Sequence, residues 1–417
     1  MLRLGLWWQA RRGARGSLVD ALPEQAKVAL RRDGLDPVAA LGASGPVTPV
    51  RLPLGLRGWL VTGYDEVRAV LADVNTFSND FGHLVGRGHI GQEQNPGGLG
   101  FTDPPYHTRV RRLLTPEFTA RRLARLAPLI DGIVADRLDA MAAAADQNGR
   151  VDLWQHFALP IPWLTICELL GVPDGDREAL RLLSGDRFDV GGGAGASLGA
   201  VSESLEHLRD LVARQRAAPG PGLLGALVVE HGAELDDLEL AGLADGILTG
   251  GLETTASTLA LGTLVLLQDD HALDSLRHGG DAPREMVAEL LRYLSVVQVA
   301  FPRFAREACS VGGQAVATGD VVLCSLSAAN RDPRQGENLD RFDPTRPARS
   351  HLAFGHGVHR CVGAELARME LEAALPGLAR RFPQLQLAVA PDEVRFRALS
   401  VVFGLEALPV LLGPSTT

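Results

Sequence analysis

A cysteine in a glycine-rich stretch is the residue with the clearest chemical potential. The stretch FGHGVHRCVG, residues 354–363, places Cys361 just before a segment predicted to be helical, Ala364 to Ala374. Backbone N–H groups at a helix start point towards such a sulfur, and with the helix dipole they favour thiolate over thiol. The thiolate can serve as a nucleophile or a metal ligand, and the glycines allow the backbone to approach a flat partner. The alternative is a buried structural cysteine in a glycine turn, since free cysteines are among the most buried residues.

A second unusual stretch lies in the middle of a long helical pattern. Gly250 and Gly251 are followed by Leu252, Glu253 and Thr254. Each glycine costs roughly 1 kcal/mol relative to alanine in a helix interior, and β-branched threonine adds to the cost. A break in local preference is expected at functional sites. The alternative is a helix crossing that needs small residues, with Glu253 exposed to solvent.

Two pairs of charged residues stand at helical spacing. Glu289 and Arg292 are three residues apart on one helix face, a pattern that is usually an exposed ion pair worth less than about 1 kcal/mol. His107 and Arg111 are four residues apart at a helix start, so together they can bind one anion. The plainer interpretation of the second pair is a basic surface helix.

Helical periodicity dominates the chain around these residues. Apolar residues recur on one face from Arg121 to Ala145 and from Asp237 to Gln268, which predicts two long helices. Strand-like segments are short and lie towards the two ends of the chain: Trp59 to Thr62, Val321 to Cys324, and Leu385 to Val389.

Loops rich in glycine or proline separate these elements. They are predicted at Asn79 to Gly100, Asp189 to Gly199 and Ala218 to Gly222. None has the composition of a flexible linker between domains. The pattern therefore predicts a mainly α fold with small β-sheets (α+β), as a single large helical domain over residues 17–417 preceded by a tail over residues 1–16.

Composition and charge exclude several classes of protein. Of the 417 residues, 46% are hydrophobic and 22% are charged, a globular composition that excludes disorder as the main state. The net charge of −9 disfavours a general nucleic-acid-binding protein. Four cysteines without a CxxC pair exclude a disulfide framework and a zinc ribbon, and they favour a reducing compartment. Because no uncharged apolar run is long enough to cross a membrane, we expect a cytoplasmic protein.

The cysteine stretch matches Phe-Gly-x-Gly-x-His-x-Cys-x-Gly at every fixed position. In this the chain resembles the cytochrome P-450 haem-thiolate monooxygenases, and the resemblance extends from about Ser17 to Leu412. It implies the P-450 fold, with Cys361 as the protein ligand of the haem iron. The remaining haem-binding residues that it implies are Phe354, Gly355, His359 and Gly363 in the loop, and His107, Arg111 and Arg303 as contacts to the propionates.

The resemblance also gives a role to the other two motifs. Glu253 and Thr254 correspond to an acid and an alcohol that relay protons to bound oxygen, which implies an active monooxygenase. Glu289 and Arg292 correspond to a buried structural pair, and Arg341 corresponds to the arginine that completes its network.

The implied activity is insertion of one oxygen atom from O₂ into a small apolar substrate, by hydroxylation or epoxidation in natural-product tailoring. The cofactor is haem b. The electrons come from a separate ferredoxin and ferredoxin reductase, so NAD(P)H acts only indirectly, because the chain has no flavin or nicotinamide fingerprint. We expect a monomer with no membrane span and no nucleic-acid partner. Substrate-facing positions are expected in the loops 79–100 and 186–197 and at Leu248, Leu252, Val299, Ala300 and Phe301.

Three alternatives remain open at this point. The same haem can couple two aromatic rings or run on peroxide, although an intact Glu253–Thr254 pair argues against the peroxide variant. The chain can instead be a catalytically silent haem protein that senses a gas or recruits another oxygenase. A carrier of apolar ligands without haem would leave the cysteine loop without a role.

Arginines are concentrated near the haem motifs although the chain as a whole is acidic. They are Arg109, Arg112, Arg121, Arg122, Arg125 and Arg360. We expect a basic surface behind the thiolate that docks an acidic ferredoxin and accelerates its association. The alternative is that these arginines are ordinary solvated helix faces.

Overall fold

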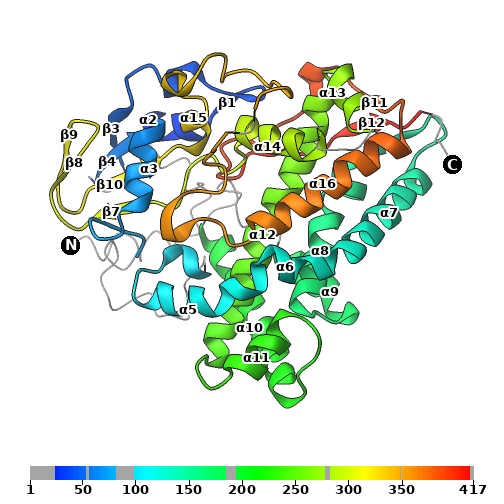
Figure 1. Cartoon of the computed structure of the whole chain (residues 1–417), viewed down its shortest axis with the longest axis horizontal. Coiled ribbons are helices and arrows are strands. Elements are labelled where there is room, and N and C mark those ends of the chain that lie inside the picture. Colours follow the sequence, from blue (N-terminus) through cyan, green and yellow to red (C-terminus); the bar gives the residue numbers. More distant parts are fainter. Residues whose placement is uncertain are drawn as a thin grey trace.

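The longest helix that the structure describes runs through the centre of the molecule (Figure 1). The computed structural model describes residues 24–52, 56–80, 98–184, 194–277, 282–347 and 349–413. The central helix, α12 (Asp237–Leu266), begins at a capping box, in which the Asp236 carboxylate accepts from the Glu239 N–H at 2.7 Å. Almost every side chain in its second half is buried. A helix that is apolar all round belongs in a core, and α12 is the helix on which the fold is built.

Most of the other helices lie around α12, in the lower and right-hand parts of Figure 1. The most extensive contacts with it are made by α8 (Pro160–Leu170), α10 (Ala194–Ala217) and α16 (Ala364–Arg381). Smaller contacts are made by α11 (Leu223–His231), α13 (Asp270–Ser275) and α14 (Ala282–Leu294). The remaining helices of this part are α5 (Tyr106–Leu114), α6 (Ala120–Leu123), α7 (Ala127–Ala144) and α9 (Asp174–Ser184).

A five-stranded sheet lies on the left of Figure 1, beside the helices. Its strand order is β3-β4-β10-β7-β5. Strand β10 pairs in parallel with β4, with Val321 opposite Gly58, and antiparallel with β7, with Val322 opposite Arg303. The pairing with β7 therefore ties Arg303 to the centre of the sheet. The strands are β3 (Val47–Arg51), β4 (Arg57–Val61), β5 (Phe77–Ser78), β7 (Arg303–Ala305) and β10 (Val321–Cys324).

Smaller elements complete the described part of the chain. A three-stranded sheet has the order β11-β12-β6, and two further pairs are β1-β2 and β8-β9. Helix α3 covers the five-stranded sheet, and its apolar residues share a cluster with those of the strands. The bounds are β1 (Arg32–Asp33), β2 (Asp36–Pro37), β6 (Arg150–Asp152), β8 (Cys309–Val311), β9 (Gln314–Val316), β11 (Gln386–Leu387), β12 (Pro409–Leu411), α2 (Glu24–Lys27), α3 (Tyr64–Ala72) and α15 (Leu326–Ala329).

The mainly α-helical fold with small sheets is confirmed, and two local predictions are wrong. The helix predicted from Arg121 to Ala145 is divided into α6 and α7 by a short 3₁₀ turn. Pro128 explains the division, because its ring would clash with the carbonyl of the preceding turn in an unbroken helix but is tolerated in the first turn of α7. The loop predicted at Asp189 to Gly199 overlaps the start of α10, where alanines favour helix.

The remaining elements follow the sequence expectations more closely. The helix predicted from Asp237 to Gln268 ends two residues earlier, and the strand predicted at Val321 to Cys324 is β10. The predicted tail, residues 1–16, lies outside the described residues, as do most of the two predicted covering loops. None of the described helices combines the length and apolarity that crossing a membrane requires.

Candidate active site

The cysteine loop folds into a tight turn between the sheet and α16. Gly355 and Gly357 adopt the left-handed conformation, with φ values of 70° and 73°, which glycine adopts without steric cost. A Cβ atom at Gly357 would also lie 2.5 Å from the Leu71 carbonyl oxygen. The Cys361 N–H donates to the Phe354 carbonyl at 2.9 Å and closes the loop. Two glycines of the motif are thus required by geometry.

Cys361 is the exposed cysteine of the chain. Its side chain is accessible to solvent, yet enough protein surrounds it that burial raises the pKa of the thiol. The Gly363 N–H and three guanidinium groups oppose this effect, since they stabilise the thiolate. Burial also raises the pKa of Cys167 and of Cys324 to about 12, so these two thiols stay protonated and inert. The chain thus offers one accessible sulfur surrounded by cations.

Two imidazole rings lie together beside this loop without polar partners. The ring centroids of His107 and His359 are 4.1 Å apart. Neither nitrogen of His107, nor Nε2 of His359, has a hydrogen-bond partner among the described residues, although all three atoms are buried. Burial lowers the pKa of His107 to about 4 and that of His359 to about 3, so both rings are neutral. Buried polar atoms are normally paired, and these nitrogens therefore indicate a ligand with hydrogen-bonding oxygens.

Two arginines flank the imidazole pair. Arg111, one turn after His107, donates from Nη2 to the Arg360 carbonyl at 2.7 Å. Arg303 is only 4% exposed and donates from Nη1 to the Phe301 carbonyl at 2.7 Å. Burial lowers the pKa of both guanidinium groups. A guanidinium has five N–H donors, so each retains donors for an anion. The two predicted imidazoles and two predicted arginines are thus brought together by three separate segments.

The paired glycines of α12 have different environments. A Cβ atom at Gly251 would lie 2.7 Å from Cδ1 of Ile166, so close packing against α8 requires this glycine. A Cβ atom at Gly250 would meet nothing within 4 Å among the described residues. The Thr254 hydroxyl donates to the Gly250 carbonyl at 2.7 Å, while the helix remains continuous. Gly250 therefore leaves one face of α12 open next to the threonine.

Glu253 is held in an ion pair that the sequence did not predict. Its carboxylate pairs with the guanidinium of Arg397. Arg397 also donates from Nε to the Leu405 carbonyl at 3.1 Å, and its guanidinium carbon lies 4.7 Å from the centroid of Trp154. Because Arg397 is 144 positions from Glu253 in sequence, no spacing rule could have found it. The predicted relay acid is thus tied to the C-terminal part of the chain.

The predicted structural network is present, but one of its arginines was assigned wrongly. Glu289 and Arg292 are buried and make two hydrogen bonds of 2.7 and 2.8 Å. The additional guanidinium on Glu289 belongs to Arg346, which donates from Nε at 3.3 Å. Arg341 contributes only its backbone carbonyl, which accepts from Arg292 at 3.0 Å, and its side chain is exposed. The loop turns between the two arginines, so Arg346 points inward.

The predicted substrate positions differ in accessibility. Leu248 has no exposed surface and packs in the core, which favours a structural role, and Leu252 is 6% exposed. Val299 and Ala300 are partly buried. Phe301 is 41% exposed, and its ring packs edge to face on Phe101 with the centroids 4.6 Å apart. Phe101 was not predicted. Residues 81–97 and 186–193 of the predicted covering loops lie outside the described residues.

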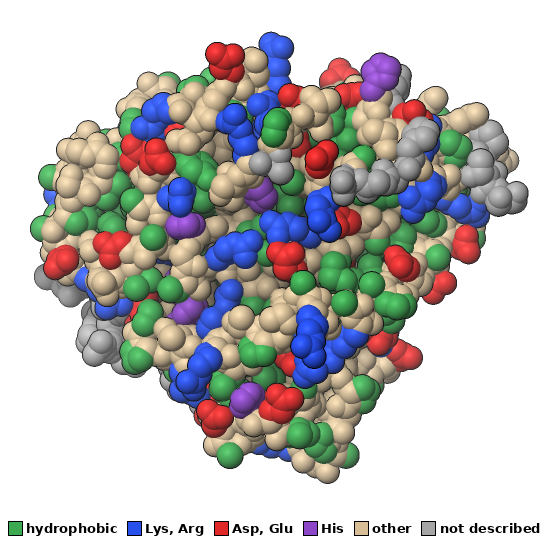
Figure 2. Space-filling view, viewed as in Figure 1, with side chains coloured by type: hydrophobic (Ala, Val, Ile, Leu, Met, Phe, Trp, Pro, Cys, Tyr) green, Lys and Arg blue, Asp and Glu red, His purple; other side chains and the backbone are tan. Residues whose placement is uncertain are grey.

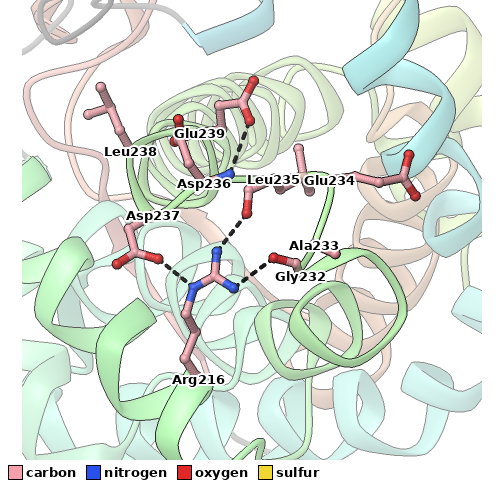
Figure 3. Close-up of a pocket in the computed structure, with 9 residues that line it drawn as sticks. All are labelled: Arg216, Gly232, Ala233, Glu234, Leu235, Asp236, Asp237, Leu238 and Glu239. Atoms are coloured by element: carbon pink, nitrogen blue, oxygen red, sulfur yellow. Dashed lines mark hydrogen bonds and ion pairs between the residues drawn. The ribbon is translucent and has the colours of Figure 1, made fainter.

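A separate surface hollow of about 680 Å³ lies at the start of α12 and the end of α11, away from the cysteine loop (Figure 3). Its centre is Arg216, which pairs with Asp237 and donates to the carbonyls of Gly232 and Leu235 at 2.9 and 2.6 Å. These contacts join α10 to the turn before α12. We attribute the hollow to a structural junction and place the active site at Cys361.

The face that carries the cysteine loop and α16 is rich in basic side chains. Figure 2 shows Lys and Arg side chains gathered around the middle of this face. Arg122 and Arg125 both pair with the buried carboxylate of Glu117. Arg109 pairs with the Glu239 carboxylate. Of the six arginines predicted for this surface, Arg112, Arg121 and Arg360 are exposed and have no ion-pair partner among the described residues. These ion pairs with carboxylates therefore reduce the net positive charge of the predicted basic surface.

The site residues fit a haem. The accessible thiol can ligate iron, and the unpartnered nitrogens of His107 and His359, with the free donors of Arg111 and Arg303, match two carboxylates of a planar anionic group. The open faces of Gly250 and Gly363, where a Cβ atom would meet no described atom within 4 Å, leave room on two elements. The site is thus that of a haem-thiolate protein.

Comparisons with known proteins give the same class. The family model for cytochrome P450 matches residues 284–396. Cytochrome P450 165B3 of Amycolatopsis orientalis is 38% identical over 91% of this chain and 97% of its own length. The 6-deoxyerythronolide B hydroxylase of Saccharopolyspora erythraea is 37% identical over 90% of this chain and 95% of its own length.

Solved structures agree with these relatives. P450 StaH from glycopeptide antibiotic biosynthesis superposes with a TM-score of 0.83, at 40% identity over 92% of this chain and 99% of its own. OxyC, a cytochrome P450 implicated in an oxidative C–C coupling reaction during vancomycin biosynthesis, superposes with a TM-score of 0.81 at 37% identity, over 91% of this chain and 95% of its own. The chain belongs to the cytochrome P450 family, and it is a cytochrome P450 monooxygenase with the P450 fold.

Proposed function

We propose that this monooxygenase holds haem b through Cys361 and oxidises an apolar natural product, with electrons supplied by a ferredoxin. The observation that carries the proposal is the buried pair His107 and His359, whose unpartnered nitrogens lie with two arginines beside the accessible thiol. When bound, the haem supplies the oxygen chemistry, and the protein supplies binding, orientation and protons.

The protein groups around the haem have distinct roles in this proposal. Cys361 binds as thiolate, which the Gly363 N–H and the neighbouring arginines favour. Arg111 and Arg303 neutralise the propionates, and the two neutral imidazoles donate hydrogen bonds to them. Thr254 presents an exchangeable hydroxyl at the opened face of α12. Glu253, beside it, is the acid that replenishes this proton after it separates from Arg397.

The experiment that tests haem ligation is the absorption spectrum of the reduced, carbon-monoxide-bound protein. A thiolate ligand gives a Soret band shifted far to the red, and we expect this band in the wild type and in Cys324→Ser. Cys361→His should lose it while retaining haem. An unshifted band in the folded wild-type protein would exclude Cys361 as the ligand.

The substrate is proposed to be a natural-product scaffold that the enzyme hydroxylates or epoxidises, and the name of a relative, the 6-deoxyerythronolide B hydroxylase, supports hydroxylation. A second candidate reaction is coupling of two aromatic rings. It is favoured by similarity to OxyC and by the exposed Phe301 ring on Phe101, which offers an aromatic surface for an aryl substrate. Optical titration with macrolides and with aryl-containing peptides separates the two candidates.

The electron donor is proposed to be an acidic ferredoxin that docks behind the thiolate. Arg112 and Arg360 support this proposal, because both are exposed and without an ion-pair partner in the described ranges. Opposite charges accelerate encounter and are screened over about 8 Å at physiological salt. Ferredoxin-driven reduction should therefore slow as ionic strength rises.

A further inference from the structure

The ring of Phe354, at the start of the cysteine loop, has a neutral and a charged side chain as neighbours. The Phe354 carbonyl accepts the Cys361 N–H at 2.9 Å. The neutral neighbour is His351, with ring centroids 5.8 Å apart. Burial, followed by the effect of nearby Arg368, lowers the pKa of His351 to about 4, so this imidazole is neutral. The charged neighbour is Arg368, whose guanidinium carbon lies 5.0 Å from the centroid of the Phe354 ring.

Arg368 is a cation whose position is well defined. It stands on α16, seven residues after Cys361, and its side chain is 27% exposed. Contact between a guanidinium and an aromatic face is attractive and fixes the orientation of both groups. The ring that Arg368 contacts belongs to Phe354, the residue whose carbonyl accepts the Cys361 N–H at 2.9 Å. The charge of Arg368 therefore acts on the sulfur in a partly dehydrated setting, where screening by solvent is weaker than in water.

A carboxylate on the same helix reduces this charge. Glu365, one turn before Arg368, forms an ion pair with it, and the Glu365 side chain is 45% exposed. Both residues lie in the first two turns of α16. A positive and a negative charge thus stand side by side, with the positive charge over the ring of Phe354, the residue whose carbonyl accepts the Cys361 N–H.

We propose that Arg368 is a positioning residue that raises the reduction potential of the bound haem iron, and that Glu365 moderates this effect. In the reduction step the iron gains one electron from the ferredoxin, the thiolate remains bound, and no proton moves. Because the haem iron and its thiolate ligand together become more negative on reduction, a fixed cation stabilises the reduced state and a fixed anion destabilises it. The net charge and the hydrogen bonds around a ligand sulfur are established means by which a protein adjusts such potentials. The inference rests on haem binding, as proposed above.

The test is a spectroelectrochemical titration of the substrate-free holoprotein, which requires neither ferredoxin nor turnover. Arg368→Gln should shift the potential to more negative values, equivalent to an equilibrium constant for reduction about threefold to tenfold lower. Glu365→Gln should shift it in the opposite direction. Arg368→Lys keeps the positive charge, and its reduction potential should lie between those of the wild type and Arg368→Gln.

The matched control is Arg381→Gln on the same helix. Arg381 pairs with Asp139 on α7, three to four turns from Arg368, and its loss should leave the potential unchanged. If the two residues act only by supporting the structure, the reduction potentials of Arg368→Gln and Glu365→Gln should shift in the same direction. This result would overturn the inference. Unchanged potentials in both variants also overturn it. If the wild type lacks a thiolate-type spectrum, the haem assignment itself fails, so the two failures are distinguishable.

Discussion

Glu370 offers a quantitative test of the packing beneath the active site. This residue lies on α16, is 2% exposed, and its Oε1 atom has no hydrogen-bond partner in the part of the chain that the structure describes. Thr165 on α8 is its polar neighbour, and the Thr165 hydroxyl already donates to the Ile161 carbonyl at 2.9 Å. Burial raises the pKa of Glu370 to about 8, which the contact with Thr165 only partly offsets. The folded protein therefore holds Glu370 protonated at neutral pH.

The sign and size of the effect follow from linkage. In the unfolded chain the Glu370 carboxyl has a pKa near 4.5, well below its value in the folded state. Between these two values the unfolded state releases the proton and the folded state keeps it, so stability is lost as pH rises. The slope is about 1.4 kcal/mol for each pH unit, and the accumulated cost at pH 7 is about 3 kcal/mol.

Glu370→Gln removes this titration while keeping the shape of the side chain. We expect the free energy of unfolding of the wild type to fall relative to that of the variant by about 2 to 3 kcal/mol between pH 5.5 and pH 7.5. Urea unfolding followed by far-ultraviolet circular dichroism at three pH values measures this difference, and any contribution from haem release is common to both proteins. Glu365→Gln, an exposed position on the same helix, is the control. Parallel pH profiles for the wild type and Glu370→Gln would refute the reasoning.

Three further predictions concern turnover. Thr254→Ala should retain haem and substrate binding but divert electrons to peroxide, so that product formed per NADPH consumed falls about tenfold or more; unchanged coupling would make the threonine structural. Arg397→Gln should change the product formed per NADPH consumed while leaving haem and substrate binding intact, because Glu253 loses the cation that holds it; unchanged coupling would show that the ion pair does not influence the relay. Arg360→Glu should slow stopped-flow reduction by ferredoxin severalfold at low salt and leave substrate titration unchanged; indifference to both charge and salt would place the donor elsewhere.

Local motifs were the part of the site that the sequence could predict. The cysteine loop is continuous in sequence, and its glycines are demanded by local backbone geometry at Gly355 and Gly357. The neighbourhood of His107 and His359 was predictable only through the resemblance, since these residues are 252 positions apart and meet only in the folded chain. Long, strongly periodic α12 was also predictable, because both its cap and its apolar pattern are local.

The errors arose where tertiary contact decides between similar residues. Two arginines of one loop, Arg341 and Arg346, are both near enough in sequence to complete the network, and only the path of the loop selects Arg346. Leu248 stands on the same helix as the relay residues, but its face turns into the core. Periodicity assigns a residue to a helix face without identifying what covers that face.

The pairing of Glu253 with Arg397 has a mechanical consequence for proton delivery. Arg397 is held from three directions, by the Glu253 carboxylate, the Leu405 carbonyl and the face of Trp154. Glu253 stands next to Thr254 on a helix that is open at Gly250. Of the two partners, the carboxylate is the one expected to change rotamer when the relay operates, because it adjoins Thr254, while Arg397 remains anchored by the Leu405 carbonyl and the face of Trp154. The ion pair then sets how often the acid reaches the threonine, and weakening it from the Trp154 side should alter proton delivery without altering either relay residue.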